Sequence, residues 1–151
     1  MTVNEKFFQW LDKLESGEIQ QGLGSLHRIH SNTNGEEVER MCCLGVCSSM
    51  FADDLSITVK REGTGVYYND KAHYPTKDVL QHMGIPETHI VERSIGWSVD
   101  ISTPKDIKAR IGDDYFDTGR VGVDVLNDNK YTHPEIAALL RAEFAPETVE
   151  A

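Results

Sequence analysis

The sequence lacks the local patterns that identify an enzyme most directly. It contains no phosphate-binding loop with its lysine, no Gly-x-Ser-x-Gly turn and no His-Glu-x-x-His zinc motif. The pair Gly22 and Gly24 is too short for a dinucleotide fingerprint, which needs a third glycine and a preceding parallel strand. Enzymes of this size usually show at least one recognisable group of catalytic residues. We therefore expect a protein that binds rather than catalyses.

Long apolar runs and basic residues are also scarce. No run approaches the roughly 18 apolar residues that span a bilayer, and residues 1–6 show no basic segment leading into an apolar one. We expect a cytoplasmic protein that does not contact membranes. Lysine and arginine number 15 against 25 aspartates and glutamates, for a net charge of −10. This charge disfavours direct nucleic-acid binding and favours a basic protein partner, although surplus charge also serves solubility alone.

Cysteine is limited to Cys42, Cys43 and Cys47. An odd number with two adjacent residues is not the pattern of a disulfide framework, and reduced thiols in a cytosol fit it better. Cysteine is often buried as a small apolar residue, so we predict core packing and no bound metal or cofactor. The alternatives are a metal site that adds His27 or His30 to the three thiols, and a reactive nucleophile.

The histidines do little to favour these alternatives. His27 and His30 lie three residues apart, so a strand would turn them to opposite faces, and we expect both on the surface of a hairpin. A nucleophilic Cys43 or Cys47 would need one of three histidines as its base: His27, His30 or His133.

Length and periodicity predict one domain of the α+β class. At 151 residues and 39% apolar composition the chain can bury its own core. Helices are predicted over residues 4–16, 42–51 and 77–83, from Thr103-Pro104, and from Thr132 to the proline at 146. Strands are predicted up to His30, over 38–41, through the alternating Leu55, Ile57 and Val59, over 66–68 and over 95–101, with turns at 31–35 and 63–65. We expect a single compact domain over residues 1–146, with an antiparallel hairpin-built sheet packed against several helices, an irregular acidic stretch over 112–122, and a flexible acidic tail over 147–151.

Two local signals are sharper than the rest. Thr132 and Glu135 form a capping-box pattern, which marks the start of the last helix. Gly45 lies inside the predicted helix over 42–51, where glycine costs about 1 kcal/mol relative to alanine, so it predicts close packing at that point.

The segment Leu126-Asn127-Asp128 precedes this last helix and provides the candidate binding site. Polar side chains in a loop beside the free N–H groups of a helix N-terminus suit a small anionic or polar ligand. A turn that merely caps its own helix is the alternative. With two glutamines and a glycine from the N-terminal part, the predicted ligand-binding residues are Gln20, Gln21, Gly24, Asn127, Asp128 and Thr132.

Four segments, residues 10–22, 41–47, 74–85 and 126–137, occur in an order that resembles a family of small, mostly uncharacterised bacteriophage and prophage proteins. The most specific is Met41 to Cys47, which is similar to the family's Cys-Cys-Leu-Gly-Val segment, and the last is similar to its Leu-Asn-Asp and closing helix. Residues 87–122 have no counterpart, and Asn129-Lys130-Tyr131 replaces a glycine-containing turn. The family offers no catalytic residues to carry over. The resemblance implies a phage-related accessory protein that acts inside a bacterial cell.

These observations predict a non-enzymatic phage accessory protein that sequesters a small nucleotide-like molecule or a host protein, and so counters host defence. Three alternatives remain: an acidic DNA mimic that inhibits a host nucleic-acid-binding protein, a cysteine-dependent enzyme, and a virion structural protein. A homo-oligomer is compatible with each of them.

Overall fold

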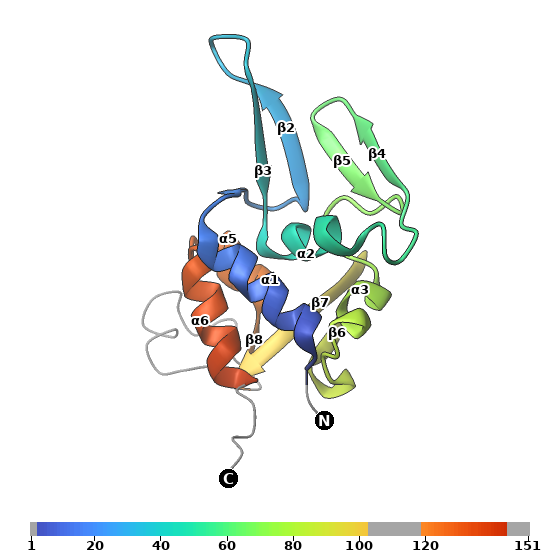
Figure 1. Cartoon of the computed structure of the whole chain (residues 1–151), viewed down its shortest axis with the longest axis vertical. Coiled ribbons are helices and arrows are strands. Elements are labelled where there is room, and N and C mark those ends of the chain that lie inside the picture. Colours follow the sequence, from blue (N-terminus) through green and yellow to red (C-terminus); the bar gives the residue numbers. More distant parts are fainter. Residues whose placement is uncertain (1–2, 103–118, 145–151) are drawn as a thin grey trace.

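A computed structural model describes residues 3–102 and 119–144 of the chain (Figure 1). The helices are α1 (Glu5–Ser16), α2 (Cys43–Phe51), α3 (Lys77–His82), α5 (Val123–Asp128) and α6 (His133–Glu143), with a short 3-10 turn, η1 (Glu87–His89). The strands are β1 (Gln20–Gln21), β2 (His27–Ser31), β3 (Glu37–Met41), β4 (Val59–Glu62), β5 (Gly65–Tyr68), β6 (Ile90–Arg93), β7 (Gly96–Ser102) and β8 (Arg120–Gly122). This arrangement confirms the predicted α+β class.

The strands form two sheets. The larger has the order β1-β3-β2-β5-β4 and is built from the hairpins β2–β3 and β4–β5, both of which project upward in Figure 1. Its pairings are antiparallel except for β1 beside β3. The smaller sheet, β6-β7-β8, is antiparallel, and β7 contacts α3, α5 and α6. The predicted hairpin turns are present, and Gly35 adopts the positive φ of 82° that the first of them needs.

Helix α2 lies at the centre of the core, and seven of its nine residues are buried. A Cβ atom added to Gly45 would lie only 1.7 Å from the backbone oxygen of Leu26, so no side chain fits there. The same oxygen accepts a hydrogen bond from the backbone N–H of Cys42 at 3.2 Å. This contact confirms the close packing predicted at Gly45, and it sets the distance between α2 and the chain that enters β2.

Helices α1 and α6 pack against each other on the other side of α2 from the hairpins (Figure 1). The apolar face of α1 buries Phe7, Trp10, Leu11 and Leu14, as its periodicity predicted. The indole of Trp10 donates a hydrogen bond to the backbone oxygen of Cys43 at 3.0 Å. The capping box of Thr132 and Glu135 is formed as predicted.

The predictions of local structure for residues 55–58 and 120–122 are wrong. Residues 55–58 do not form a strand: helix α2 continues into turns, with Ser56 at a positive φ of 54° and the Ile57 N–H bonded to the Ala52 oxygen. The turns place Ile57 in the core, whereas Val59 is exposed and begins an edge strand. The alternating apolar residues of this segment therefore do not lie on one buried face of a sheet. The acidic stretch over 112–122 also ends in a strand, β8, because Val121 is buried beside β7.

The remaining predictions fall on other parts of the chain. The helix start at Thr103-Pro104, residues 112–118 of the acidic stretch and the tail over 147–151 lie outside the described residues. Within residues 3–102 and 119–144, no helix has the length and apolar character needed to cross a bilayer.

Replacing Gly45 by alanine should destabilise the fold by about 3 kcal/mol or more, because a backbone atom blocks the added methyl group and α2 must shift. Gly35→Ala is the control: its site has open space, and only the positive φ should cost about 1 kcal/mol. Urea unfolding followed by circular dichroism compares the two variants. If both variants lost the same free energy of unfolding, the contact between α2 and Leu26 would not constrain the packing.

Candidate functional site

The structure brings four of the six predicted site residues together. Gln21 lies in β1, Gly24 in the loop that follows it, and Asn127 and Asp128 are the last two residues of α5. Hydrogen bonds connect Gln21 with Asn127 and Gly24 with Asp128. The other two lie apart from this network: Gln20 is exposed in β1, and the Thr132 side chain caps α6.

The prediction that Asn127 and Asp128 lie in a loop is wrong. Helix α5 covers them because Val123 and Leu126 bury one face of this short helix against the core. Asn127 is buried as well, with 1% of its surface exposed. Its amide therefore points into the protein rather than toward a ligand.

The Asn127 amide holds three segments together, and we call this arrangement the Asn127 clamp. Its Oδ1 accepts hydrogen bonds from the backbone N–H of Cys43 at 3.1 Å and from Nε2 of Gln21 at 3.0 Å. Its Nδ2 donates to the backbone oxygen of Gly22 at 2.8 Å. The clamp satisfies a free N–H at the start of α2 that no residue of α2 can satisfy.

Gln21 extends the clamp to α6. Its Nε2 also donates to the backbone oxygen of Tyr131 at 2.6 Å, and its Oε1 accepts from the backbone N–H of His133 at 2.9 Å. Both ends of the Gln21 amide are therefore occupied by the protein itself. Gln21 and Asn127 act as structural residues.

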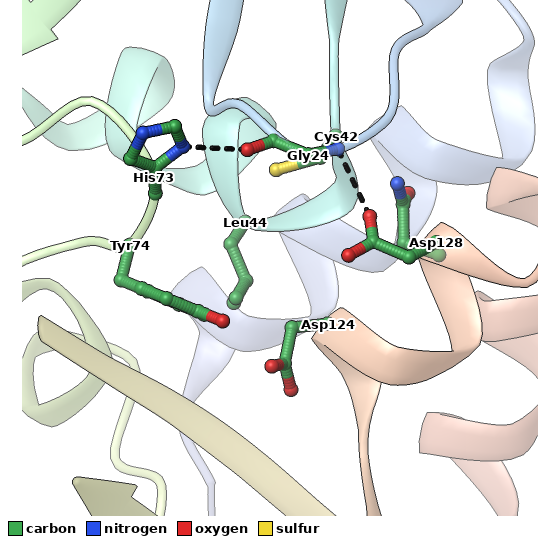
Figure 2. Close-up of a pocket in the computed structure, with 8 residues that line it drawn as sticks. Gly24, Cys42, Leu44, His73, Tyr74, Asp124 and Asp128 are labelled. Atoms are coloured by element: carbon green, nitrogen blue, oxygen red, sulfur yellow. Dashed lines mark hydrogen bonds between the residues drawn. The ribbon is translucent and has the colours of Figure 1, made fainter. Parts of the chain in front are cut away.

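Gly24 and Asp128 lie at the edge of a cleft that encloses about 280 Å³ of space, including its open mouth. Asp128 Oδ1 accepts the backbone N–H of Gly24 at 2.9 Å, and the ring Nδ1–H of His73 donates to the Gly24 oxygen at 2.6 Å. Figure 2 shows the second oxygen of Asp128 and the hydroxyl of Tyr74 directed into this space. We call it the acidic cleft; its lining residues are Gly24, Cys42, Leu44, His73, Tyr74, Asp124, Asn127 and Asp128.

Asp124 forms the floor of the acidic cleft and is held by an ion pair. Arg93 donates to its two carboxylate oxygens, each at 3.1 Å, and the Ser98 hydroxyl donates at 2.7 Å. Burial alone would raise the pKa of Asp124, but the bonds from Arg93 and Ser98 outweigh burial and hold that pKa below its usual value. Burial and the neighbouring Asp124 carboxylate raise the pKa of Tyr74. At neutral pH Asp124 is therefore ionised and the Tyr74 hydroxyl keeps its proton.

Sequence reasoning missed His73, Tyr74 and Asp124. His73 and Tyr74 come from a loop about which spacing gives no signal. Asp124 does have a signal, because it lies four residues before Asp128 and the two share one face of a helix. That signal depends on assigning residues 123–128 to a helix, and the loop assignment hid it.

The three cysteines are buried in the core, as predicted. Cys43 and Cys47 are 0% exposed and Cys42 is 8% exposed. Burial raises the pKa of the Cys42 thiol to about 12 and raises those of Cys43 and Cys47 well above the usual value. The Cys43 thiol lies 3.7 Å from the Val123 oxygen and that of Cys47 lies 3.2 Å from the Leu44 oxygen, so neither bonds to a base. A neutral buried thiol is a poor nucleophile.

The histidines that were candidate partners of the thiols lie elsewhere. His27 is buried, contrary to the expected surface position, because its ring lies between the Tyr68 hydroxyl and the Glu39 carboxylate, 2.6 Å from each. His30 lies on the opposite face of β2, as its spacing predicted. Within the described ranges, no three His, Cys, Asp or Glu side chains are grouped closely enough to hold a metal ion.

The comparisons with known proteins add no relative: no protein-family model matches the chain, and neither a curated protein nor a solved structure is significantly similar to it. The site is therefore interpreted from its own geometry.

Asn127→Ala should destabilise the protein by about 3 kcal/mol, because it leaves the buried Cys43 N–H and Gly22 oxygen without partners. Asn129→Ala is the matched control, since its amide makes one bond, to the Val125 oxygen, and its loss should cost about 1 kcal/mol. Urea unfolding measures both. If the two variants lost similar free energies of unfolding, the Asn127 clamp would contribute little to the stability of the fold.

All three thiols should resist alkylation in the folded protein. We expect iodoacetamide at neutral pH to leave Cys42, Cys43 and Cys47 unmodified while the protein is folded, because burial keeps each thiol protonated. Denaturation should release three labelling sites, which intact-mass spectrometry counts. Rapid labelling of one cysteine in the native state would favour the cysteine-dependent enzyme instead.

Proposed function

We propose that this protein is a non-enzymatic binding protein that captures a host protein by taking one of its basic side chains into the acidic cleft. The observation that carries this proposal is the position of Asp128. Its Oδ1 is fixed by the Gly24 N–H at 2.9 Å, and its other oxygen is directed into the cleft (Figure 2). A carboxylate held in this way is ready to accept hydrogen bonds from an ammonium or guanidinium group.

The size of the acidic cleft supports a side chain over a free nucleotide. Pockets for small organic ligands usually enclose roughly 300–1,000 Å³, whereas the enclosed part of this cleft has a volume of about 20 Å³, which is room for about one water molecule. An ammonium group, or one edge of a guanidinium group, is small enough to enter such a space. Of the two ligand classes predicted from the sequence, the cleft therefore favours the host protein.

The charge of the whole molecule supports the same choice. A net charge of −10 attracts a basic partner over distance and raises the rate of encounter. Its effect weakens with salt, because exposed charges are screened beyond about 10 Å at 0.1 M ionic strength. Local and long-range electrostatics thus favour the same kind of partner.

The cellular setting of the proposal comes from the sequence resemblance to phage and prophage proteins. It supports an accessory protein in the cytoplasm of a bacterial host, where capture of a host protein would counter host defence. Of the alternatives, DNA mimicry is supported less, because several carboxylates are already paired with arginines of the chain, as in Glu15–Arg141, Glu37–Arg61 and Asp124–Arg93. The cysteine-dependent enzyme gains no support from thiols that are buried and neutral.

Binding of an arginine-rich peptide should depend on Asp128. We expect an NMR titration with a short arginine-rich peptide to shift the backbone amide signals of Gly24, His73 and Asp128. Asp128→Asn should weaken the affinity about tenfold or more, because it removes a charged acceptor and keeps one for the Gly24 N–H. Asp53→Asn is the control: it removes the same charge from an exposed residue outside the cleft.

Equal weakening by the two variants would show that only net charge matters, and would contradict the proposal. The natural partner is then sought by affinity capture from a bacterial lysate, with the wild type and both variants compared. A host protein that the wild type and Asp53→Asn retain and Asp128→Asn loses would have the expected dependence.

A further inference from the structure

Two arginines face each other across the β2–β3 hairpin. Arg28 and Arg40 are directly opposite in the antiparallel register, so their side chains leave the same face of the sheet. His30 lies two residues along β2 and shares that face. Both arginines are exposed. Like charges directly opposite each other destabilise a sheet, so this pair costs stability in the free protein.

The described part of the chain does not compensate these two charges. No carboxylate in it lies within 4 Å of either guanidinium. The neighbouring Glu37 and Glu39 lie on the other face of the hairpin, where they bind Arg61 and His27. Glu62, across the sheet beyond Gly65, binds Lys60. An uncompensated arginine pair is unexpected in a protein with a net charge of −10.

The pair lines a groove of about 210 Å³, which we call the basic groove. Its lining residues are Gly22, Leu23, Ser25, Arg28, His30 and Arg40. The buried Ser25 hydroxyl accepts the Nε–H of Arg28 at 3.0 Å, which orients this guanidinium by one edge and leaves its terminal nitrogens available. Leu23 is 49% exposed and adds an apolar wall.

From this geometry we infer that the basic groove is a second binding site, which takes a small phosphate-bearing molecule of nucleotide size. Guanidinium groups match the oxygens of a phosphate in pairs, and two of them with a histidine neutralise a doubly charged group. The exposed Leu23 provides an apolar surface for the organic part of the ligand. The volume of the groove, about 210 Å³, lies just below the usual range for small ligands, roughly 300–1,000 Å³, so part of a bound mononucleotide would stay in solvent.

A free small molecule fits this site better than a nucleic acid. A nucleic-acid backbone carries many phosphates, and each one beyond the groove would meet the acidic surface of the protein. A mononucleotide places its charge only where the two arginines are. The sequence predicts a nucleotide-like ligand, but at another set of residues: Gln20, Gln21, Gly24, Asn127, Asp128 and Thr132.

The test is an NMR titration of the protein with inorganic phosphate and with adenosine monophosphate at low ionic strength. We expect both to shift the amide signals of Leu23, Arg28 and Arg40, with the nucleotide binding more tightly. Arg40→Gln should weaken binding of the nucleotide about tenfold or more. Arg61→Gln, which removes an exposed arginine from the opposite face of the sheet, should leave the affinity unchanged.

A melting curve separates a binding role from a structural one. Because Arg40→Gln relieves the repulsion with Arg28, this variant should melt at the same temperature as the wild type or higher. Three results would overturn the inference: no shift with either probe, equal binding by the wild type and Arg40→Gln, or tighter binding of a single-stranded oligonucleotide than of the mononucleotide. Failure here is distinguishable from failure at the acidic cleft, because Arg28 and Arg40 do not line the cleft and Asp128 does not line the groove.

Discussion

The buried amide of Asn127 is the interaction on which the arrangement of this protein depends. It bonds at once to the start of α2, to Gln21 of β1 and to the backbone that follows β1. These segments are distant in sequence, and packing of apolar side chains alone would not fix their register, because apolar contacts have no direction. Hydrogen bonds do have direction, and a buried polar group left unpaired costs free energy. The Asn127 clamp therefore selects one position of α5 relative to α2.

The clamp also separates two surfaces of opposite charge. The loop that it holds, residues 22–24, contributes Gly24 to the acidic cleft and contributes Gly22 and Leu23 to the basic groove. Asp128 follows Asn127 in the chain, so the residue that faces the cleft is positioned by the residue that is buried next to it. A host protein at one surface and a phosphate-bearing molecule at the other would lie on two sides of the same short loop. Binding at one site could reach the other only through this loop and the clamp beneath it.

The sequence predicted the parts of the fold that local chemistry determines. The apolar spacing of α1, the capping box of α6 and the Asn34-Gly35 turn each depend on residues close in the chain. Gly45 could be interpreted in advance because a glycine inside a helix needs a reason. The wrong prediction at α5 has a physical cause. Helix α5 has only six residues, too few to show a helical period, and Asn and Asp are frequent in turns, so the segment was assigned to a loop.

The candidate site was predictable only in part, because its geometry depends on contacts between residues that are distant in the sequence. The sequence indicated that the regions around Gln21 and Asn127 belong together, but not which side chains would be buried and which would face solvent. His73 and Tyr74 reach the cleft only through the fold. The meeting of Arg28 and Arg40 depends on the register of the hairpin, and a shift of one residue would remove it.

Amide hydrogen exchange at Cys43 shows whether Asn127 holds the start of α2 in solution. The first N–H groups of a helix normally exchange fast, because no residue of the helix accepts them. We expect the Cys43 amide to be protected nearly as well as the core, since the buried Oδ1 of Asn127 accepts its hydrogen bond. Lys77 should exchange quickly, because it opens α3 and its N-cap side chain makes no capping bond. Equally fast exchange at Cys43 and Lys77 would show that the Asn127 clamp does not hold α2 in solution.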